Sequence, residues 1–302
     1  MVYNTAMDIL LLQWKSRIIT MLLWLPARIV IQTSGCSVKR SISYGQNVQQ
    51  RLDIYAPKPL STKGPLPVAV VVHGGGWIGG DKTEQTYFCA KLAKQGYIVC
   101  AINYRLAPRH RFPAALDDCS LALAWIRSHS TAYGGNPRAL FIAGSSAGAH
   151  LAALVAGRDN TSSGIKGLIL YYGVYDLQTV QRLSFPFLQT YLRAFLGPSG
   201  ISEQTRLKES SPITFVTNKL PPVLAITSEC DTLHPQTDQY ITALHKANVP
   251  CELLFLDKKS YPHAPHGFQP VPGNKAAKDA FAAALRSLPH TDKATPFKEV
   301  QK

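Results

Sequence analysis

The chain has 302 residues, of which 46% are hydrophobic and 17% are charged, a composition that excludes a disordered chain. The formal net charge of +14 is high, but the lysines and arginines are scattered and form no long basic block, so we expect no nucleic-acid partner. The six cysteines include no C-x-x-C pair, which disfavours a zinc or redox site and leaves a disulfide open.

Residues 1–40 differ in composition from the rest of the chain. Two apolar runs, at 9–12 and 18–31, are separated by basic residues, as in a secretory signal. Pro26 and Arg28 interrupt the second run, and a membrane-spanning helix needs about 20 apolar residues. We therefore expect a signal-like or anchor segment rather than a stable transmembrane helix.

The end of this segment, Thr33-Ser34-Gly35-Cys36, is similar to a bacterial lipoprotein box with a threonine in place of the usual leucine. Three interpretations stay open: a cleaved signal with a lipidated Cys36, an uncleaved anchor, and an upstream extension from a wrong start codon. We expect export, to the periplasm or to a lipid anchor, and a cytoplasmic protein if the start codon is wrong. In each case the folded domain is expected to begin near Ser41.

Short apolar runs then alternate with helical patterns. The run at 67–72 is continuous and β-branched, as in a strand buried on both faces of a parallel sheet. The alternation predicts an α/β fold with a mostly parallel central sheet and helices on both faces. Strands are predicted at 52–55 (an edge strand), 67–72, 97–102, 140–143, 165–171, 223–226 and 253–256, and helices at 84–95, 113–129, 146–157, 236–247 and 274–288.

The segment 175–216 breaks the alternation, since it is rich in aromatic residues and contains a helical pattern but no buried strand. An insertion between strands of a parallel sheet lies at the carboxyl edge, where ligands bind. We predict a small helical cap there, with ordinary packing helices as the alternative. The predicted organisation is thus a catalytic domain over 41–290, including this cap, and a polar tail over 291–302.

The pentapeptide at 144–148, Gly-Ser-Ser-Ala-Gly, stands between an apolar strand and a small-residue helix. A strand, a sharp turn and a helix with serine at the turn is the context of a nucleophile elbow. Ser146 has a glycine two residues away on each side, where a Cβ would clash, and Ser145 does not. Ser146 is therefore the predicted nucleophile.

A serine hydroxyl needs a base to take its proton, and the base needs a carboxylate to orient it. In the strand-turn-helix context the expected chain order is Ser, acid, His. Asp231 follows the strand at 223–226, and His266 follows the next strand. His263 is the alternative base, but the adjacent Gly267 gives the backbone at His266 more freedom to present an imidazole. Glu229 and Asp238 are the alternative acids, but only Asp231 stands at the point where the loop after the strand at 223–226 begins.

His73-Gly74-Gly75-Gly76-Trp77 directly follows the most apolar strand. Consecutive glycines let backbone N–H groups approach a substrate oxygen, and one such donor to an oxyanion contributes about 3–4 kcal/mol. The N–H of Ala147, the residue after the nucleophile, is the expected further donor. We interpret His73 as a residue that fixes the loop rather than as a base.

With these motifs in this order, the chain resembles the hormone-sensitive-lipase-like branch of the α/β-hydrolases, which includes bacterial carboxylesterases and is related to kynurenine-formamidase-like proteins. The resemblance covers roughly residues 41–288 and implies that Gly75 and Gly76 are oxyanion donors together with Ala147. Ser145 departs from it, because many relatives carry aspartate there. The similar motifs are 73–77, Gly80-Asp81-Lys82, 103–108, 112–118, 133–137, 146–151, Ser211-Pro212 and 266–268.

We therefore expect a serine carboxylesterase that acts on small-molecule esters of short to medium acyl chain, without metal or organic cofactor. The alternatives are an arylformamidase, a polysaccharide acetyl or feruloyl esterase and, from a different class, a non-catalytic binding module. We also predict that the chain forms a homodimer and that it attaches to a membrane, either through the N-terminal segment or through a lipidated Cys36.

Overall fold

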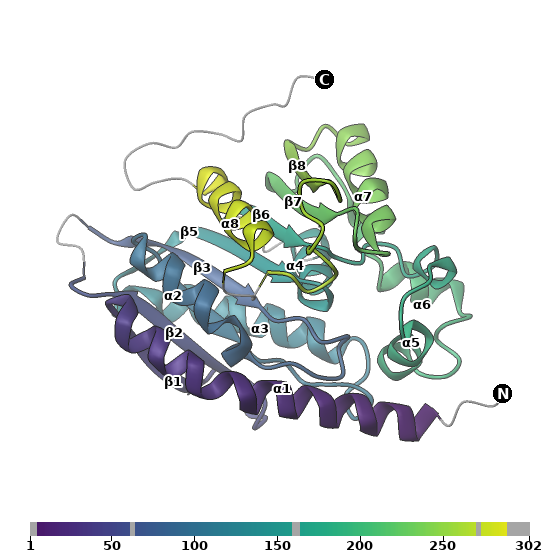
Figure 1. Ribbon diagram of the computed structural model, residues 1–302, viewed down its shortest axis with the longest axis horizontal. Coiled ribbons are helices and arrows are strands. Elements are labelled where there is room, and N and C mark those ends of the chain that lie inside the picture. The colour runs from purple at the N-terminus through teal and green to yellow at the C-terminus, as the bar shows by residue number, and fades with distance from the viewer. Residues whose placement is uncertain (1–4, 61–63, 159–163, 270–272, 289–302) are drawn as a thin grey trace.

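A computed structural model describes residues 5–60, 64–158, 164–269 and 273–288, and within its first helix the side chains of residues 7–22. Its centre is an eight-stranded sheet in the order β1-β2-β4-β3-β5-β6-β7-β8 (Figure 1). β1 and β2 are antiparallel to their neighbours, and all pairs from β4 to β8 are parallel. The strands are β1 (Cys36–Ser43), β2 (Arg51–Pro57), β3 (Leu66–Val72), β4 (Ile98–Ile102), β5 (Gly135–Ser145), β6 (Ile165–Tyr171), β7 (Val223–Ser228) and β8 (Cys251–Leu256).

Helices connect these strands, as the sequence pattern predicts. The α-helices are α1 (Thr5–Ser34), α2 (Thr86–Lys94), α3 (Ala114–His129), α4 (Ala147–Arg158), α5 (Leu188–Leu196), α6 (Gln204–Glu209), α7 (His234–Lys246) and α8 (Lys275–Ser287). Short 3₁₀ helices include η1 (Lys82–Gln85), η2 (Ser130–Tyr133), η4 (Val180–Arg182) and η5 (Pro212–Phe215).

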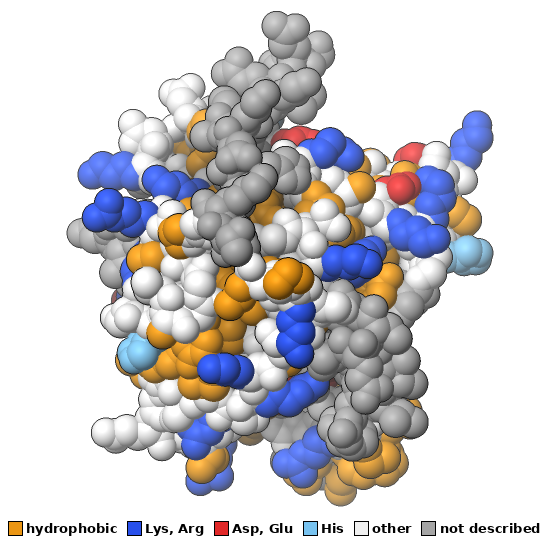
Figure 2. All heavy atoms as spheres, turned by 90° about the vertical axis from the view of Figure 1, so that its left-hand side faces the viewer, with side chains coloured by type: hydrophobic (Ala, Val, Ile, Leu, Met, Phe, Trp, Pro, Cys, Tyr) orange, Lys and Arg blue, Asp and Glu red, His pale blue; other side chains and the backbone are white. Residues whose placement is uncertain are grey.

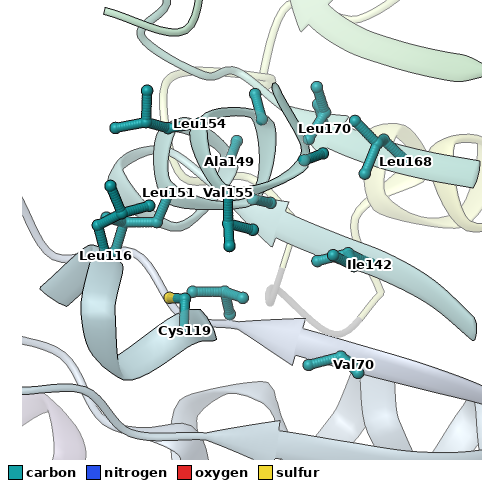
Figure 3. Packing of buried hydrophobic residues seen from close by; sticks show 14 of the residues in the cluster. Val70, Leu116, Cys119, Ile142, Ala149, Leu151, Leu154, Val155, Leu168 and Leu170 are labelled. Carbon is teal, nitrogen blue, oxygen red and sulfur yellow. The ribbon is translucent and has the colours of Figure 1, made fainter. Parts of the chain in front are cut away.

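The two faces of the sheet carry different helices. Side chains alternate along a strand, so Val68, Val70 and Val72 of β3 point to one core, and Ala69 and Val71 point to the other. The first core is closed by α3, α4 and α7 and the second by α2 and α8. Figure 3 shows the first core, with strand residues packed against α3 and α4. This is the predicted α/β fold.

The N-terminal region departs from the expectation. β1 pairs with β2, so it forms the edge of the sheet, and the strand predicted at the edge lies one position further in. The expected domain boundary at residue 41 falls inside β1, because the sheet already begins at Cys36. Local sequence could not show this, because β1 carries polar side chains and its burial depends on its partner strand.

The helix α1 runs along the outside of the molecule and packs against α2, η1 and α5 (Figure 1). No helix among the described residues has both the length and the hydrophobicity that crossing a membrane requires. No disulfide joins any of the six cysteines, all of which lie among the described residues.

The segment 175–216 follows β6 and precedes β7, and it contains α5, α6, η4 and η5 but no strand. Its side chains Phe185, Leu188 and Tyr191 line a cavity at the carboxyl edge of the sheet. The loops that follow β3, β5, β7 and β8 reach the same edge, so this edge of the sheet collects the predicted site residues.

Candidate active site

The turn after β5 places Ser146 in a left-handed backbone conformation, with φ of 53°. Its N–H donates to the carbonyl of Tyr171 on the neighbouring strand at 2.9 Å, which holds the turn against the sheet. A Cβ built on Gly148 would lie 2.2 Å from the carbonyl oxygen of Val72, so α4 can approach β3 this closely only with glycine there. The flanking glycine thus allows the sharp turn that exposes Ser146.

Ser146, His266 and Asp231 form one continuous chain of hydrogen bonds. The Nε2 of His266 lies 2.8 Å from the Oγ of Ser146, and its Nδ1 lies 2.8 Å from the Oδ2 of Asp231. A carboxylate only accepts, so Nδ1 carries the proton and Nε2 is the acceptor for the serine hydroxyl. The Asp231 side chain is 1% exposed, and its other oxygen accepts the N–H of Leu233 at 2.9 Å. This arrangement can take a proton from Ser146.

The structure separates the rival acids from the base. The carboxylate of Glu229 is exposed and accepts the backbone N–H of Lys258 at 2.8 Å. Asp238 lies in α7, is 49% exposed and pairs with His234. Asp231 is therefore the carboxylate that orients His266.

The rival base is also set apart. The His263 side chain is exposed, and the backbone carbonyl of this residue accepts a hydrogen bond from Asn274 at 2.9 Å. His266 is only 18% exposed and has the rings of Tyr172 and Phe185 packed edge-on against its imidazole, with centroids 4.8 and 4.9 Å away. These rings restrict the orientation of the base.

The glycine triplet after β3 faces the serine. Gly75 and Gly76 have φ values of 113° and 59°, which side-chain-bearing residues rarely adopt. Among the hydrogen bonds between described residues, none uses the N–H of Gly75 or Gly76. Ala147 is the first residue of α4, where helical N–H groups have no acceptor within the helix. The three predicted donors thus lie around Ser146 in the wall of the same cavity.

His73 and Trp77 hold the two ends of this glycine loop. His73 is buried, stacks on the Tyr104 ring at 4.3 Å and lies with its Nδ1 2.7 Å from the Gly74 carbonyl. Burial lowers the pKa of His73, so the ring stays neutral. The Nε1 of Trp77 donates to the Nδ1 of His150 at 3.2 Å, and burial lowers the pKa of His150 to about 4. Both histidines therefore have positioning roles, as predicted for His73.

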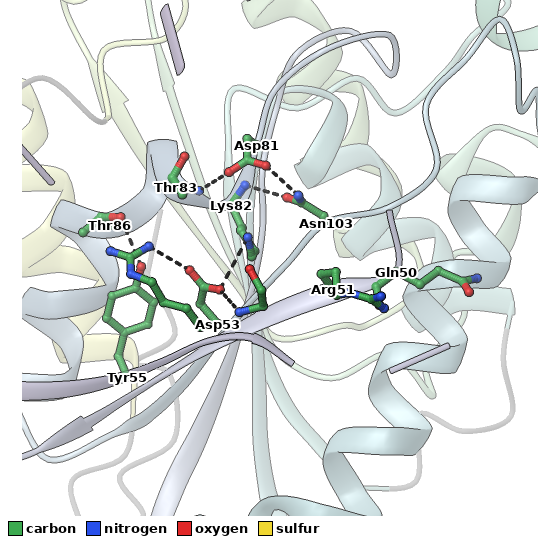
Figure 4. Close-up of polar contacts among 11 residues, drawn as sticks. Gln50, Arg51, Asp53, Tyr55, Asp81, Lys82, Thr83, Thr86 and Asn103 are labelled. Atoms are coloured by element: carbon green, nitrogen blue, oxygen red, sulfur yellow. Dashed lines mark hydrogen bonds and ion pairs between the residues drawn. The ribbon is translucent and has the colours of Figure 1, made fainter. Parts of the chain in front are cut away.

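A buried polar network anchors the segment after the glycine loop (Figure 4). Asp81 accepts from the Asn103 side chain at 2.6 Å and from the Thr83 N–H at 2.8 Å. The ammonium of Lys82 lies 3.4 Å from Asp53 of β2, in a pair with almost no exposure. Asp53 was not among the predicted residues, because nothing in its strand indicates that it faces Lys82.

The N-terminal helix makes direct contact with the oxyanion loop, which we define as residues 74–80. The Oγ of Ser16 accepts the N–H of Gly80 at 2.7 Å. The Nε2 of Gln13 donates to the carbonyls of Ile78 and Ala107 at 3.2 and 3.3 Å. The sequence did not single out Ser16 or Gln13, because a signal-like composition does not reveal which face of a helix docks.

A cavity of about 420 Å³ opens above Ser146. Glu84 lies in its wall, accepts the hydroxyl of Thr20 at 2.7 Å and has its pKa raised by burial to about 7. The oxyanion loop and His266 form the floor. Apolar side chains from α1, from the loop after β6 and from the segment 175–216 form much of the remaining wall: Leu12, Ile19, Val174, Phe185, Leu188 and Tyr191.

Comparison with known proteins finds relatives that match most of the chain. A sequence profile described as alpha/beta hydrolase fold matches residues 69–270. The chain is 31% identical over 281 residues to "Esterase LipC" of Mycobacterium tuberculosis, covering 87% of this chain and 68% of that protein. It is 29% identical to "Carboxylesterase NlhH" of the same organism, covering 83% and 82%. Two further curated relatives are matched over 48% and 56% of their own length.

A solved structure is likewise similar to this chain over most of its length. The crystal structure of esterase LipW from Mycobacterium marinum superposes with a TM-score of 0.78 at 26% identity, covering 94% of this chain and 90% of that one.

Proposed function

Because this chain belongs to the α/β-hydrolase fold family, we propose that it is a serine carboxylesterase, with Ser146, His266 and Asp231 as its catalytic residues. The observation that carries the proposal is the unbroken Ser146–His266–Asp231 hydrogen-bond chain at the base of an apolar cavity. Beside it lie the N–H groups of Gly75 and Gly76, which have no acceptor among the described residues. The three relatives named above are esterases, which supports the same reaction class.

In the first half of the reaction, the Oγ of Ser146 attacks the ester carbonyl while the Nε2 of His266 accepts the serine proton. Asp231 stabilises the imidazolium that forms, and its burial keeps this interaction free of competing water. The N–H groups of Gly75, Gly76 and Ala147 donate to the oxyanion of the tetrahedral intermediate. His266 then gives its proton to the leaving alcohol, and an acyl-enzyme remains.

In the second half, a water molecule gives a proton to His266 and attacks the acyl carbon through the same oxyanion site. The carboxylic acid leaves as Ser146 regains its proton. No step of this reaction requires a metal or an organic cofactor. That the protein works without one remains a prediction.

The cavity supports short to medium acyl chains. Its volume of about 420 Å³ is near the lower end of the range for small-molecule sites, about 300–1,000 Å³. Phe185, Leu188 and Tyr191 close it on the cap side, and Leu12 and Ile19 close it on the side of α1. Long acyl chains would have to displace these side chains.

The test is hydrolysis of p-nitrophenyl esters from acetate to palmitate, beside N-formylkynurenine and acetylated xylan. We expect kcat/KM to be highest at four to eight acyl carbons, an estimate from the cavity size. Ser146→Ala should lower kcat by about 10⁴-fold or more. The matched variant Ser145→Ala removes the adjacent hydroxyl and should lower it by less than about tenfold. Equal loss in both variants would contradict the assignment of Ser146.

Export, lipidation of Cys36 and a homodimer remain predictions. The proposed catalytic activity does not depend on any of these three predictions. Cys36 is only 5% exposed and belongs to the core beneath β1, so a lipidated Cys36 would have to leave the sheet. Cleavage before it would also remove the α1 side chains that contact the oxyanion loop. We therefore favour a retained N-terminal segment. Mass measurement of the mature protein tests this, and light scattering tests the homodimer.

A further inference from the structure

The outward face of α1 carries an unusual concentration of exposed apolar side chains. Seven of the twelve large apolar side chains that are exposed among the described residues lie on this helix. Trp14 is 61% and Met21 is 70% exposed. Clustered exposure of this kind marks an interaction surface, whereas single exposed residues need no explanation. The outward stripe consists of Met7, Leu10, Leu11, Trp14, Met21 and Leu22.

The stripe lies opposite the docked face of the same helix. Ile9 and Leu12 pack against the core formed by Ile78, Ala107 and Ala194, and Gln13 and Ser16 bond the oxyanion loop. At 3.6 residues per turn, the stripe residues fall within about a third of the helix circumference, on the far side from these contacts. The stripe can therefore meet a partner without undocking α1.

Basic side chains border the stripe on both sides. By the same helical spacing, Lys15 lies at one edge of the stripe and Arg17 at the other. Asp8 is the only acidic residue in the sequence of α1.

The surface beside α1 is basic as well. A groove next to the helix is lined by Arg17, Arg109 and Arg111, and the acidic residue in its lining, Asp81, is already engaged by Asn103. Lys and Arg side chains are also spread over the face drawn in Figure 2, with few acidic side chains between them. The chain as a whole carries a formal net charge of +14.

We propose that α1 attaches the protein to an anionic lipid surface, lying in the plane of the membrane with its stripe among the acyl chains and its basic borders at the phosphates. An apolar face containing tryptophan and leucine, bordered by Lys and Arg, is typical of interfacial helices. A second copy of the chain fits less well as the partner, because the positively charged Lys15 and Arg17 of one copy would face the same positively charged residues of the other copy.

The position of the stripe has a consequence for substrate access, which rests on the proposed function. Leu12, Lys15, Ser16 and Ile19 of α1 line the cavity above Ser146. An ester dissolved in the lipid surface would therefore meet the cavity next to the attached helix.

Binding of the full chain to lipid vesicles tests the proposal. We expect cosedimentation with vesicles of equal parts phosphatidylcholine and phosphatidylglycerol, and weaker binding to phosphatidylcholine alone or at high salt. The double variant Leu10→Ser/Trp14→Ser should lower the partition coefficient by at least about tenfold. Arg17→Gln should lower it about fivefold on the anionic vesicles and have little effect on the neutral ones.

Leu121→Ser is the matched control, because Leu121 is 42% exposed on α3, away from α1. Hydrolysis of a soluble short ester shows that each variant is folded, since the stripe residues do not line the cavity. Equal binding by Leu10→Ser/Trp14→Ser and the wild-type protein, or no vesicle binding, would overturn the proposal. A dimer that this double variant abolishes, in a protein that ignores vesicles, would assign the stripe to a second copy instead.

Discussion

Replacing Ser16 with alanine should weaken catalysis although Ser16 is far from Ser146 in the sequence. Its hydroxyl oxygen accepts the N–H of Gly80 at 2.7 Å, at the end of the oxyanion loop. The variant leaves this partly buried N–H without its acceptor, so the loop loses one of its fixed points on α1. Gln13 supplies the other contact, through the Ile78 carbonyl at 3.2 Å.

The size of the effect follows from what is lost. One neutral hydrogen bond contributes about 1 kcal/mol. If the transition state loses this much stabilisation because the loop holds its N–H donors less well, the rate falls about fivefold. Loss of a whole oxyanion donor costs about 10²- to 10³-fold and sets the upper limit. We expect Ser16→Ala to lower kcat about fivefold and Gln13→Ala/Ser16→Ala about 10- to 30-fold.

The assay is steady-state hydrolysis of p-nitrophenyl butyrate, with inhibition by a trifluoromethyl ketone, whose adduct places an oxyanion against the loop. The inhibition constant should rise in proportion to the loss in kcat/KM, and Ser16→Thr should restore both. Ser128→Ala is the matched control, because among the described residues this α3 hydroxyl bonds only the Ala124 carbonyl of its own helix. A lower melting temperature with unchanged kcat and unchanged inhibition would refute the positioning role and leave α1 a stabilising element only.

Three further predictions concern single residues. Asp231→Asn should lower kcat about 10⁴-fold, because the base loses its orienting charge, whereas Glu229→Gln should keep near wild-type rates. Gly76→Ala should lower kcat/KM about 100-fold, because the new Cβ would lie 2.3 Å from the Tyr191 ring. Adding Tyr191→Ala to the same chain should recover part of the loss. If it recovers none, the defect lies in the backbone conformation of residue 76 and not in the clash with the ring. The pKa of Glu84 is raised by burial from 4.5 to about 7, so the folded protein keeps a proton that the unfolded chain releases. The free energy of unfolding should fall as pH rises from 4.5 to 7, by at most about 3 kcal/mol, and Glu84→Gln should lack this fall when urea unfolding is compared at pH 5 and pH 8.

The sequence predicted the central features because their signals are local. The run at 67–72 must be buried on both faces, and it forms β3 in the middle of the sheet. Ser146 needs glycines at fixed positions around it, and Asp231 and His266 each follow a strand whose end reaches the same edge. Each feature follows from a few neighbouring residues and from the rule that parallel strands end together.

The N-terminal region could not be predicted in the same way. An apolar, signal-like run and a docked helix have the same composition, and only the packed structure shows that Gln13 and Ser16 meet the oxyanion loop. Asp53 likewise is an ordinary strand residue until β2 lies beside η1 and Lys82. Contacts between segments distant in the chain carry no local signal, so tertiary packing decides them.

The assignment of Ser146 as the nucleophile is tested most directly by locating the side chain that reacts. The full chain is treated with a fluorophosphonate, which phosphonylates an activated serine, and the adduct is mapped by mass spectrometry of its peptides. We expect a single adduct on Ser146, absent from Ser146→Ala and formed much more slowly in His266→Ala. An adduct on another residue, or ester hydrolysis that survives in Ser146→Ala, would contradict it.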